Sequence, residues 1–123
     1  MPTLSTAARN AACNAIVDLI DAGAAAGKLI FRTSGDVEVA TLTFSDPAFG
    51  NAATGVATAS AITSDTSATG GTTTKATLED SDATIVVTCT VGTSGSDINM
   101  NAVVVGAGAT VAVTSLTVTV PAS

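Results

Sequence analysis

The sequence predicts a mainly β fold, a seven- to eight-stranded antiparallel sandwich or jelly-roll-like domain with one N-terminal α-helix. Apolar residues recur with a helical period over residues 5–21, and after residue 28 they follow a period of two in short stretches between turn residues. The chain holds 24 Ala and 22 Thr among 123 residues, and Thr suits the outer face of strands. We therefore expect residues 1–27 to form a helical segment with a Gly/Ala linker, and residues 28–123 to form one β domain.

The helix is expected over residues 5–21. Either Ser5 or Thr3 can accept hydrogen bonds from the free N–H groups of its first turn. Five residues at helical spacing form one apolar stripe, which is small enough to approach another surface closely: Ala8, Ala12, Ala15, Ile16 and Leu19. The Gly-containing residues 22–27 are expected to end the helix, since glycine suits a left-handed cap.

Short strands are expected along the rest of the chain, at residues 28–32, 37–44, 56–62, 72–78, 84–91, 97–105 and 110–120. The strand at 84–91 alternates most clearly and places four residues on one face: Ile85, Val87, Cys89 and Val91. The alternation changes phase at Thr114 and Ser115, which predicts a β-bulge there. Residues 102–120 are long and uncharged enough to suggest a membrane span, but their Val- and Thr-rich composition favours strands.

Composition excludes several kinds of chemistry. The chain has no His, so zinc sites built on His, His-based acid–base catalysis and Ser-His-Asp triads are impossible. A net charge of −6 with four basic residues and neither Trp nor Tyr argues against binding nucleic acid. Residues 1–32 carry a net charge of +1 and residues 33–123 carry −7. This difference favours ordinary surface charge, and the alternative is a polarity that steers docking. We expect no catalytic residue, metal, cofactor or membrane partner.

The remaining candidate sites have simpler interpretations. Residues 79–82, with Asp97, form a carboxylate cluster, but they lack the spacing of a calcium loop and are typical of a solvated turn. Residues 92–96 lack both the spacing of a nucleophile elbow and a base, which favours a tight turn. Cys13 and Cys89 are far apart, and we expect two separate thiols. The N-terminus shows no signal-peptide pattern.

Three groups of sequence strings carry a resemblance to a known class of protein. They lie at residues 5–12 and 16–23, at residues 43–50, 55–59 and 61–65, and at residues 80–82 and 91–99. In these strings the chain resembles small virion proteins of tailed bacteriophages and prophages that come from the head-gene region. The chain departs from that pattern at residues 72–74, where three Thr stand in place of bulkier or aromatic residues.

This resemblance implies a non-enzymatic capsid decoration (cement) protein on the outer surface of the virion, which bridges neighbouring major capsid proteins. It also implies a homo-oligomer, with a trimer favoured over a dimer. The candidate contact residues are Leu4, Arg9, Ile16, Ile20, Arg32, Pro47 and Phe49. The contacts are expected in the N-terminal segment 2–20 and in the loop at residues 47–51. An alternative for residues 2–20 is a helix packed on its own β domain. Alternatives for the function are a tail or fibre component and a cell-surface adhesion or immunoglobulin-like module.

Overall fold

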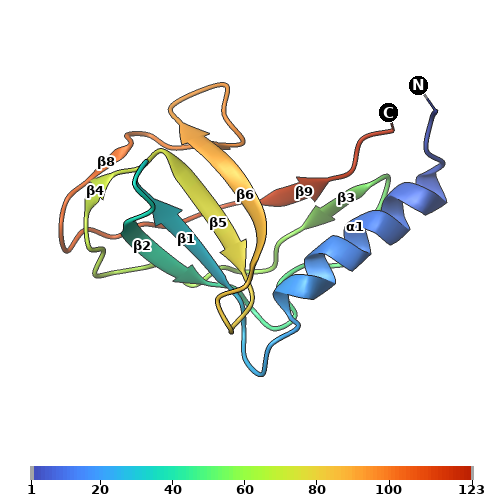
Figure 1. Cartoon of the computed structure of the whole chain (residues 1–123), viewed down its shortest axis with the longest axis horizontal. Helices are drawn as coiled ribbons and strands as arrows, with labels where there is room; N and C mark the ends of the chain where they lie inside the picture. The colour runs from blue at the N-terminus through green and yellow to red at the C-terminus, as the bar shows by residue number, and fades with distance from the viewer. Residues whose placement is uncertain (1, 123) are drawn as a thin grey trace.

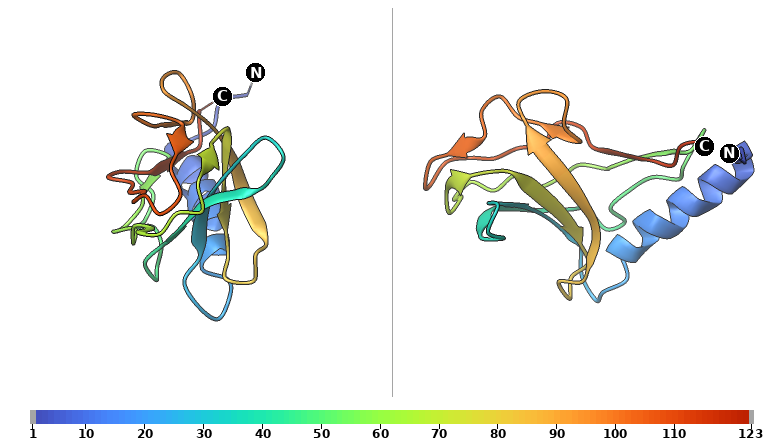
Figure 2. Two further views of the ribbon diagram at one scale, coloured as in Figure 1. Left: turned by 90° about the vertical axis from the view of Figure 1, so that its left-hand side faces the viewer. Right: turned by 45° about the horizontal axis from the view of Figure 1, so that its top comes forward.

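The computed structural model describes residues 2–122, in which a curled β-sheet is flanked at one end by a single long helix (Figure 1). The described chain contains one helix and nine short strands. A mainly β chain with one N-terminal helix is therefore confirmed. Both termini lie at the end of the molecule that carries the helix, away from the sheet (Figures 1 and 2).

Helix α1 spans Thr6–Ile20 and begins where the sequence predicts. The Ser5 hydroxyl accepts a hydrogen bond from the N–H of Ala8 at 3.1 Å, so Ser5 is the N-cap. At the other end, Asp21 is the C-cap.

The buried face of α1 is formed by Cys13, Val17 and Ile20. The predicted apolar stripe does not form this face. Four of its five residues are exposed: Ala8, Ala12, Ala15 and Leu19. The stripe therefore lies mainly on the outer side of the helix.

The main sheet has the strand order β2-β1-β5-β6-β7. Its strands are β1 (Lys28–Arg32), β2 (Glu38–Thr43), β5 (Lys75–Glu79), β6 (Ile85–Gly92) and β7 (Ile98–Asn99). All neighbours pair antiparallel except β6 and β7, which are parallel. Two small sheets complete the fold: β3 (Val56–Thr58) with β9 (Thr117–Thr119), and β4 (Gly71–Thr72) with β8 (Val104–Val105).

The predicted strand count and sandwich or jelly-roll topology are not confirmed, because short strands are divided among three sheets. The stretch 97–105 contains two strands, β7 and β8, in different sheets. In the stretch 110–120 the structure has only β9, and the bulge predicted at Thr114 and Ser115 is absent because residues 112–115 form no strand. Before β9, Val111 pairs with Asp65 and the carbonyl of Leu116 accepts from Ala59, so this segment crosses between separate partners.

The core lies on one face of the main sheet. Side chains alternate across β1 and β5, so Leu29, Phe31 and Leu78 point inward and are almost fully buried. The face predicted for β6 is wrong at Ile85, which is 55% exposed. The register shifts between Leu78 and Glu79, and this irregularity removes Ile85 from the inward-facing set.

Candidate interaction surface

Helix α1 forms most of the predicted contact segment at residues 2–20. Hydrogen bonds join it to the loop at residues 48–55. The Asn10 side-chain oxygen accepts from the N–H of Gly55 and the Asn14 oxygen accepts from the N–H of Ala52, each at 2.8 Å. The Asp21 carboxylate accepts from the N–H of Ala48 at 3.0 Å. These polar residues lie on one side of the helix because their spacing follows its turns. The helix thus packs on its own chain through this side.

A second set of contacts joins α1 to the C-terminal strand β9 and the residue after it. The Arg9 Nε donates to the carbonyl of Val120 at 2.9 Å, and the Cys13 Sγ donates to the carbonyl of Val118 at 3.2 Å. Gly55 lies beside this junction with a φ of 78°, and a Cβ there would be 2.7 Å from Arg9 Nε. Glycine is required at this position both for its backbone conformation and for the close approach.

The outer face of α1 remains free and is largely apolar. Leu19 is 55% exposed, and Leu4, just before the helix, is 44% exposed. The exposed residues on the side of the helix opposite its buried face are mostly small and uncharged: Ala8, Ala11, Ala12 and Ala15. Asp18 is the one exposed charge within α1. This face is therefore suited to close contact with another surface.

The seven predicted contact residues have different environments. Leu4 and Pro47 are exposed, and the peptide bond before Pro47 is cis. Three are half-buried: Arg9, Ile16 and Arg32. Ile20 and Phe49 are buried in the core, where their side chains cannot reach a partner. The structure does not bring the seven residues together at one place.

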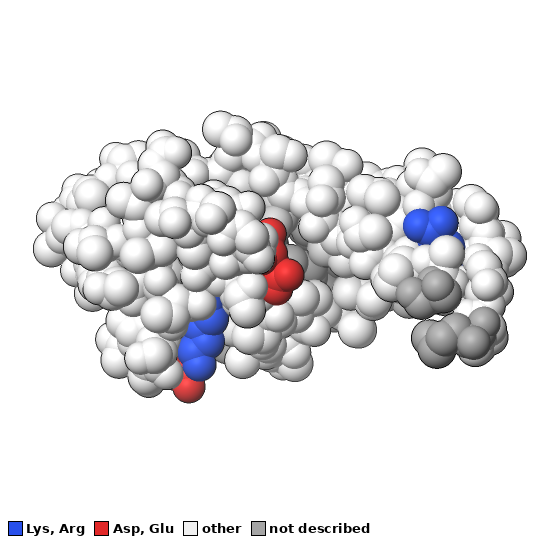
Figure 3. Space-filling model, turned by 90° about the horizontal axis from the view of Figure 1, so that it is seen from above, with Lys and Arg blue, Asp and Glu red and all other residues white. Residues whose placement is uncertain are grey.

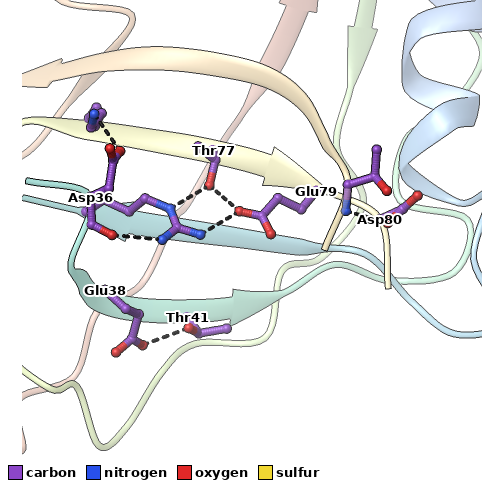
Figure 4. Close-up of polar contacts among 9 residues, drawn as sticks. Asp36, Glu38, Thr41, Thr77, Glu79 and Asp80 are labelled. Carbon is purple, nitrogen blue, oxygen red and sulfur yellow. Dashed lines mark hydrogen bonds and ion pairs between the residues drawn. The ribbon is translucent and has the colours of Figure 1, made fainter. Parts of the chain in front are cut away.

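Arg32 is engaged within the chain. Its Nη2 pairs with the Glu79 carboxylate at 2.8 Å, its Nε donates to the Thr77 hydroxyl, and its Nη1 donates to the carbonyl of Asp36 (Figure 4). Glu79 is 2% exposed, and Arg32 is the cation that pairs with its buried carboxylate. Lys75 in turn pairs with the Asp36 carboxylate at 2.6 Å and holds the pKa of that carboxyl below its usual value. Arg32 therefore stabilises the sheet.

The carboxylates of the predicted acidic cluster have separate roles. The Asp80 carboxylate accepts from the N–H groups of Asp82 and Thr84, which is the hydrogen bonding of a turn. Asp97 lies at β7 and accepts from the N–H of Thr90 at 2.9 Å. Within residues 2–122 no three carboxylate or thiol groups gather to hold a metal ion.

The two cysteines are both free thiols, as the sequence predicts. Cys13 is buried in the helix, whereas Cys89 is half-buried on β6. Burial, with the nearby charge of Asp97, raises the pKa of the Cys89 thiol. No helix within the described residues has both the length and the apolar composition that crossing a membrane demands.

A groove of about 660 Å³ opens between two segments that follow one another in the sequence and are joined by residues 106–109. Residues 97–105 contribute one wall and residues 110–117 the other. The least exposed of the lining residues are apolar: Phe31, Val105, Val111 and Leu116. Asp97 is the one charged residue in the lining. The molecular face seen in Figure 3 is largely uncharged and is hollowed near its middle, where carboxylate atoms are visible.

The sequence does not predict this groove. Its walls were predicted as two ordinary strands, and nothing in either stretch indicates that they stand apart. Comparisons with family models, with curated proteins and with solved structures give no match. The resemblance in the sequence strings and the chain's own surfaces are therefore the basis for a proposed function.

Proposed function

We propose that this protein is a non-enzymatic capsid decoration protein, which stabilises a phage shell by bridging neighbouring major capsid proteins on its outer surface. The proposal includes self-association into a homo-oligomer, with a trimer favoured. The sequence strings at residues 5–23, 43–65 and 80–99 are the basis for the phage assignment.

One structural observation supports a contact role above all: the free apolar face of α1. The helix is fixed to the chain through its other sides by Asn10, Asn14 and Arg9, so its free face is presented on a supported element. Leu19, which is more than half exposed, is a large apolar side chain that favours burial against a partner. The neighbouring alanines allow a second surface to approach closely.

A protein with this surface can act by mass action. A subunit that binds the assembled shell, and not the separated shell proteins, lowers the free energy of the assembled state. Many modest contacts that are repeated over a shell add to a large stabilisation. No reactive side chain is needed for this role.

The test is binding of purified protein to phage shells that lack it. We expect the wild-type chain to bind in a saturable way and Leu19→Glu and Ala12→Glu to bind at least about tenfold more weakly, because each places a charge in the contact. Both side chains are exposed, so the folded state is expected to persist in these variants.

The matched control is Val37→Glu, which adds the same charge at an exposed apolar residue in the turn between β1 and β2. This variant is expected to bind like the wild type. Equal binding by all four proteins would exclude the α1 face as the contact. A wild-type chain that does not bind shells would contradict the proposed function itself.

A further inference from the structure

The groove has an unusual wall at residues 112–115. On either side of this segment the backbone is paired: Val111 exchanges hydrogen bonds with Asp65, and the Leu116 carbonyl accepts from Ala59. Between them, the N–H and C=O groups of residues 112–115 have no hydrogen-bond partner within the described chain. Backbone groups of this kind are satisfied by water or by a binding partner.

The facing wall is an open sheet edge. The N–H of Met100 donates to the Gly92 carbonyl at 2.8 Å, so residue 100 faces β6. Alternation along a strand then turns the N–H and C=O of Asn99 away from β6. Asn99 lines the groove, and its backbone has no hydrogen-bond partner on that side among the described residues. The groove therefore lies along the outer edge of the last strand of the main sheet.

The opposite edge of the same sheet is closed by the chain itself. Thr43 on β2 pairs with Thr63, and the N–H of Thr41 donates to the Asp65 carboxylate at 2.9 Å. The Val39 carbonyl accepts from Gly70. Covering of this kind prevents a foreign strand from pairing. The chain thus protects one edge of the sheet and leaves the other open along a groove.

The lining adds chemical selectivity. The nearly buried side chains of Phe31, Val105 and Leu116 favour an apolar side chain at the bottom of the groove. Asp97 is held in place by two hydrogen bonds with Thr90, and it favours a cation at one end. Unpaired backbone on both walls favours an extended polypeptide, because its own N–H and C=O groups can pair with them.

We propose that this groove binds an extended segment of another protein, which adds a strand to β7, directs an apolar side chain toward the groove bottom and places a Lys or Arg beside Asp97. A second copy of this chain is a poor source, because its cations all lie within α1, β1 and β5: Arg9, Lys28, Arg32 and Lys75. The partner that would supply this segment is a shell protein, and in this respect the proposal rests on the proposed function.

The test selects peptides of about eight residues, longer than an average strand, from a random displayed library on the immobilised full chain. We expect the recovered peptides to alternate apolar and polar residues and to carry a Lys or Arg. Ala112→Trp, which fills the groove from an exposed lining position, should weaken their binding by about tenfold or more. Ala107→Trp, an equally exposed alanine outside the lining, should leave binding unchanged.

Two further variants and one measurement complete the test. If Ala112→Trp does not fold, Ala102→Trp blocks the groove from the other wall and should have the same effect. Asp97→Asn keeps an oxygen for the N–H of Thr90 and should remove the preference for basic peptides. Hydrogen exchange should show unprotected amides at Asn99 and residues 112–115 in the free protein and slower exchange with a selected peptide bound.

Three results would overturn the proposal: no peptide retained above background, binding that survives both Ala112→Trp and Ala102→Trp, or full amide protection at Asn99 and residues 112–115 in the free chain. Failure of peptide binding with normal binding to shells removes the groove proposal alone. Groove-dependent peptide binding by a chain that does not bind shells removes the decoration role alone.

Discussion

The side-chain oxygen of Asn10 accepts a hydrogen bond from the N–H of Gly55 at 2.8 Å and so ties the helix to a loop 45 residues further along the chain. Asn14 repeats the contact at Ala52. A segment that the resemblance assigns to capsid contact is therefore also part of the fold's own framework. Only its outer face is free to bind, and variants of α1 must be sorted by which face they change.

Removing one of these amide contacts should lower stability even though alanine favours the helix more than asparagine does. In Asn14→Ala, the half-buried N–H of Ala52 loses its acceptor, and the free energy of unfolding should fall by about 1 kcal/mol. Urea denaturation measures the change. Asp18→Ala is the control, since the Asp18 side chain is exposed and its carboxylate makes no hydrogen bond within residues 2–122. A loss as large in this variant would show that the amide contact is not the cause.

The Asp21 carboxylate combines a useful acceptor with an unfavourable charge. Burial raises the pKa of this carboxyl above its usual value. The hydrogen bond from the N–H of Ala48 opposes this shift, and the nearby charges of Asp46 and Asp18 add to it. A raised pKa in the folded state favours folding at low pH, and this contribution is lost as pH rises through that pKa. Asp21→Asn keeps the acceptor and should gain stability relative to the wild type between about pH 4 and pH 7.

Asp21→Ala tests the role of Asp21 as a hydrogen-bond acceptor. It leaves the fully buried Ala48 without an acceptor for its N–H, and should cost about 1–2 kcal/mol at any pH in the same range. Thermal unfolding of both variants across that range decides the matter. Equal destabilisation by Asn and Ala at neutral pH would disagree with the expected roles.

Replacing Arg32 alone should lower stability more than replacing both Arg32 and Glu79. Arg32→Met leaves a carboxylate that is 2% exposed without its cation, and should lower the free energy of unfolding by about 3 kcal/mol. Adding Glu79→Met should restore much of that loss, because no uncompensated charge remains. A double-mutant cycle in urea measures the coupling, and additive losses would refute it. Weak shell binding by an Arg32 variant must therefore be corrected for unfolding.

Asp65 should make the covered edge of the sheet sensitive to acid. Hydrogen bonds from the N–H groups of Thr41 and Ser67 lower its pKa. The ionised carboxylate therefore stabilises the folded state at neutral pH, and this contribution is lost as pH falls below about 4 through the lowered pKa. Asp65→Ala should be less stable by about 1 kcal/mol at neutral pH and should lose less stability than the wild type on acidification. Parallel acid titrations of the two proteins would contradict this.

The sequence predicted those elements that depend on local chemistry. The Ser5 cap and the strand at residues 28–32 lie where expected, since each follows from a short pattern of residues. The two free thiols also agree with the prediction. The cap and the strand each follow from a few neighbouring residues, and the prediction for the thiols follows from the wide separation of the two cysteines along the chain.

The features that were missed depend on how separate segments of the chain pack and pair. Alanines on several sides of α1 make its periodicity ambiguous, and the buried side is decided by partners such as Gly55 and Val120. Ile85 is exposed because the pairing of β5 with β6 changes register, which an alternating pattern cannot show. The groove exists because residues 97–105 and 110–117 stand apart, and this separation leaves no mark in either segment.

The central claim, a decoration role on the capsid, is tested most directly by locating the protein in purified phage particles. DNA-filled heads and tails are separated, and the amount of this protein is measured against the major capsid protein by quantitative mass spectrometry. The proposal predicts that the protein is found in heads, with a copy number close to that of the capsid protein. Recovery with tails, and none in DNA-filled heads, would contradict it.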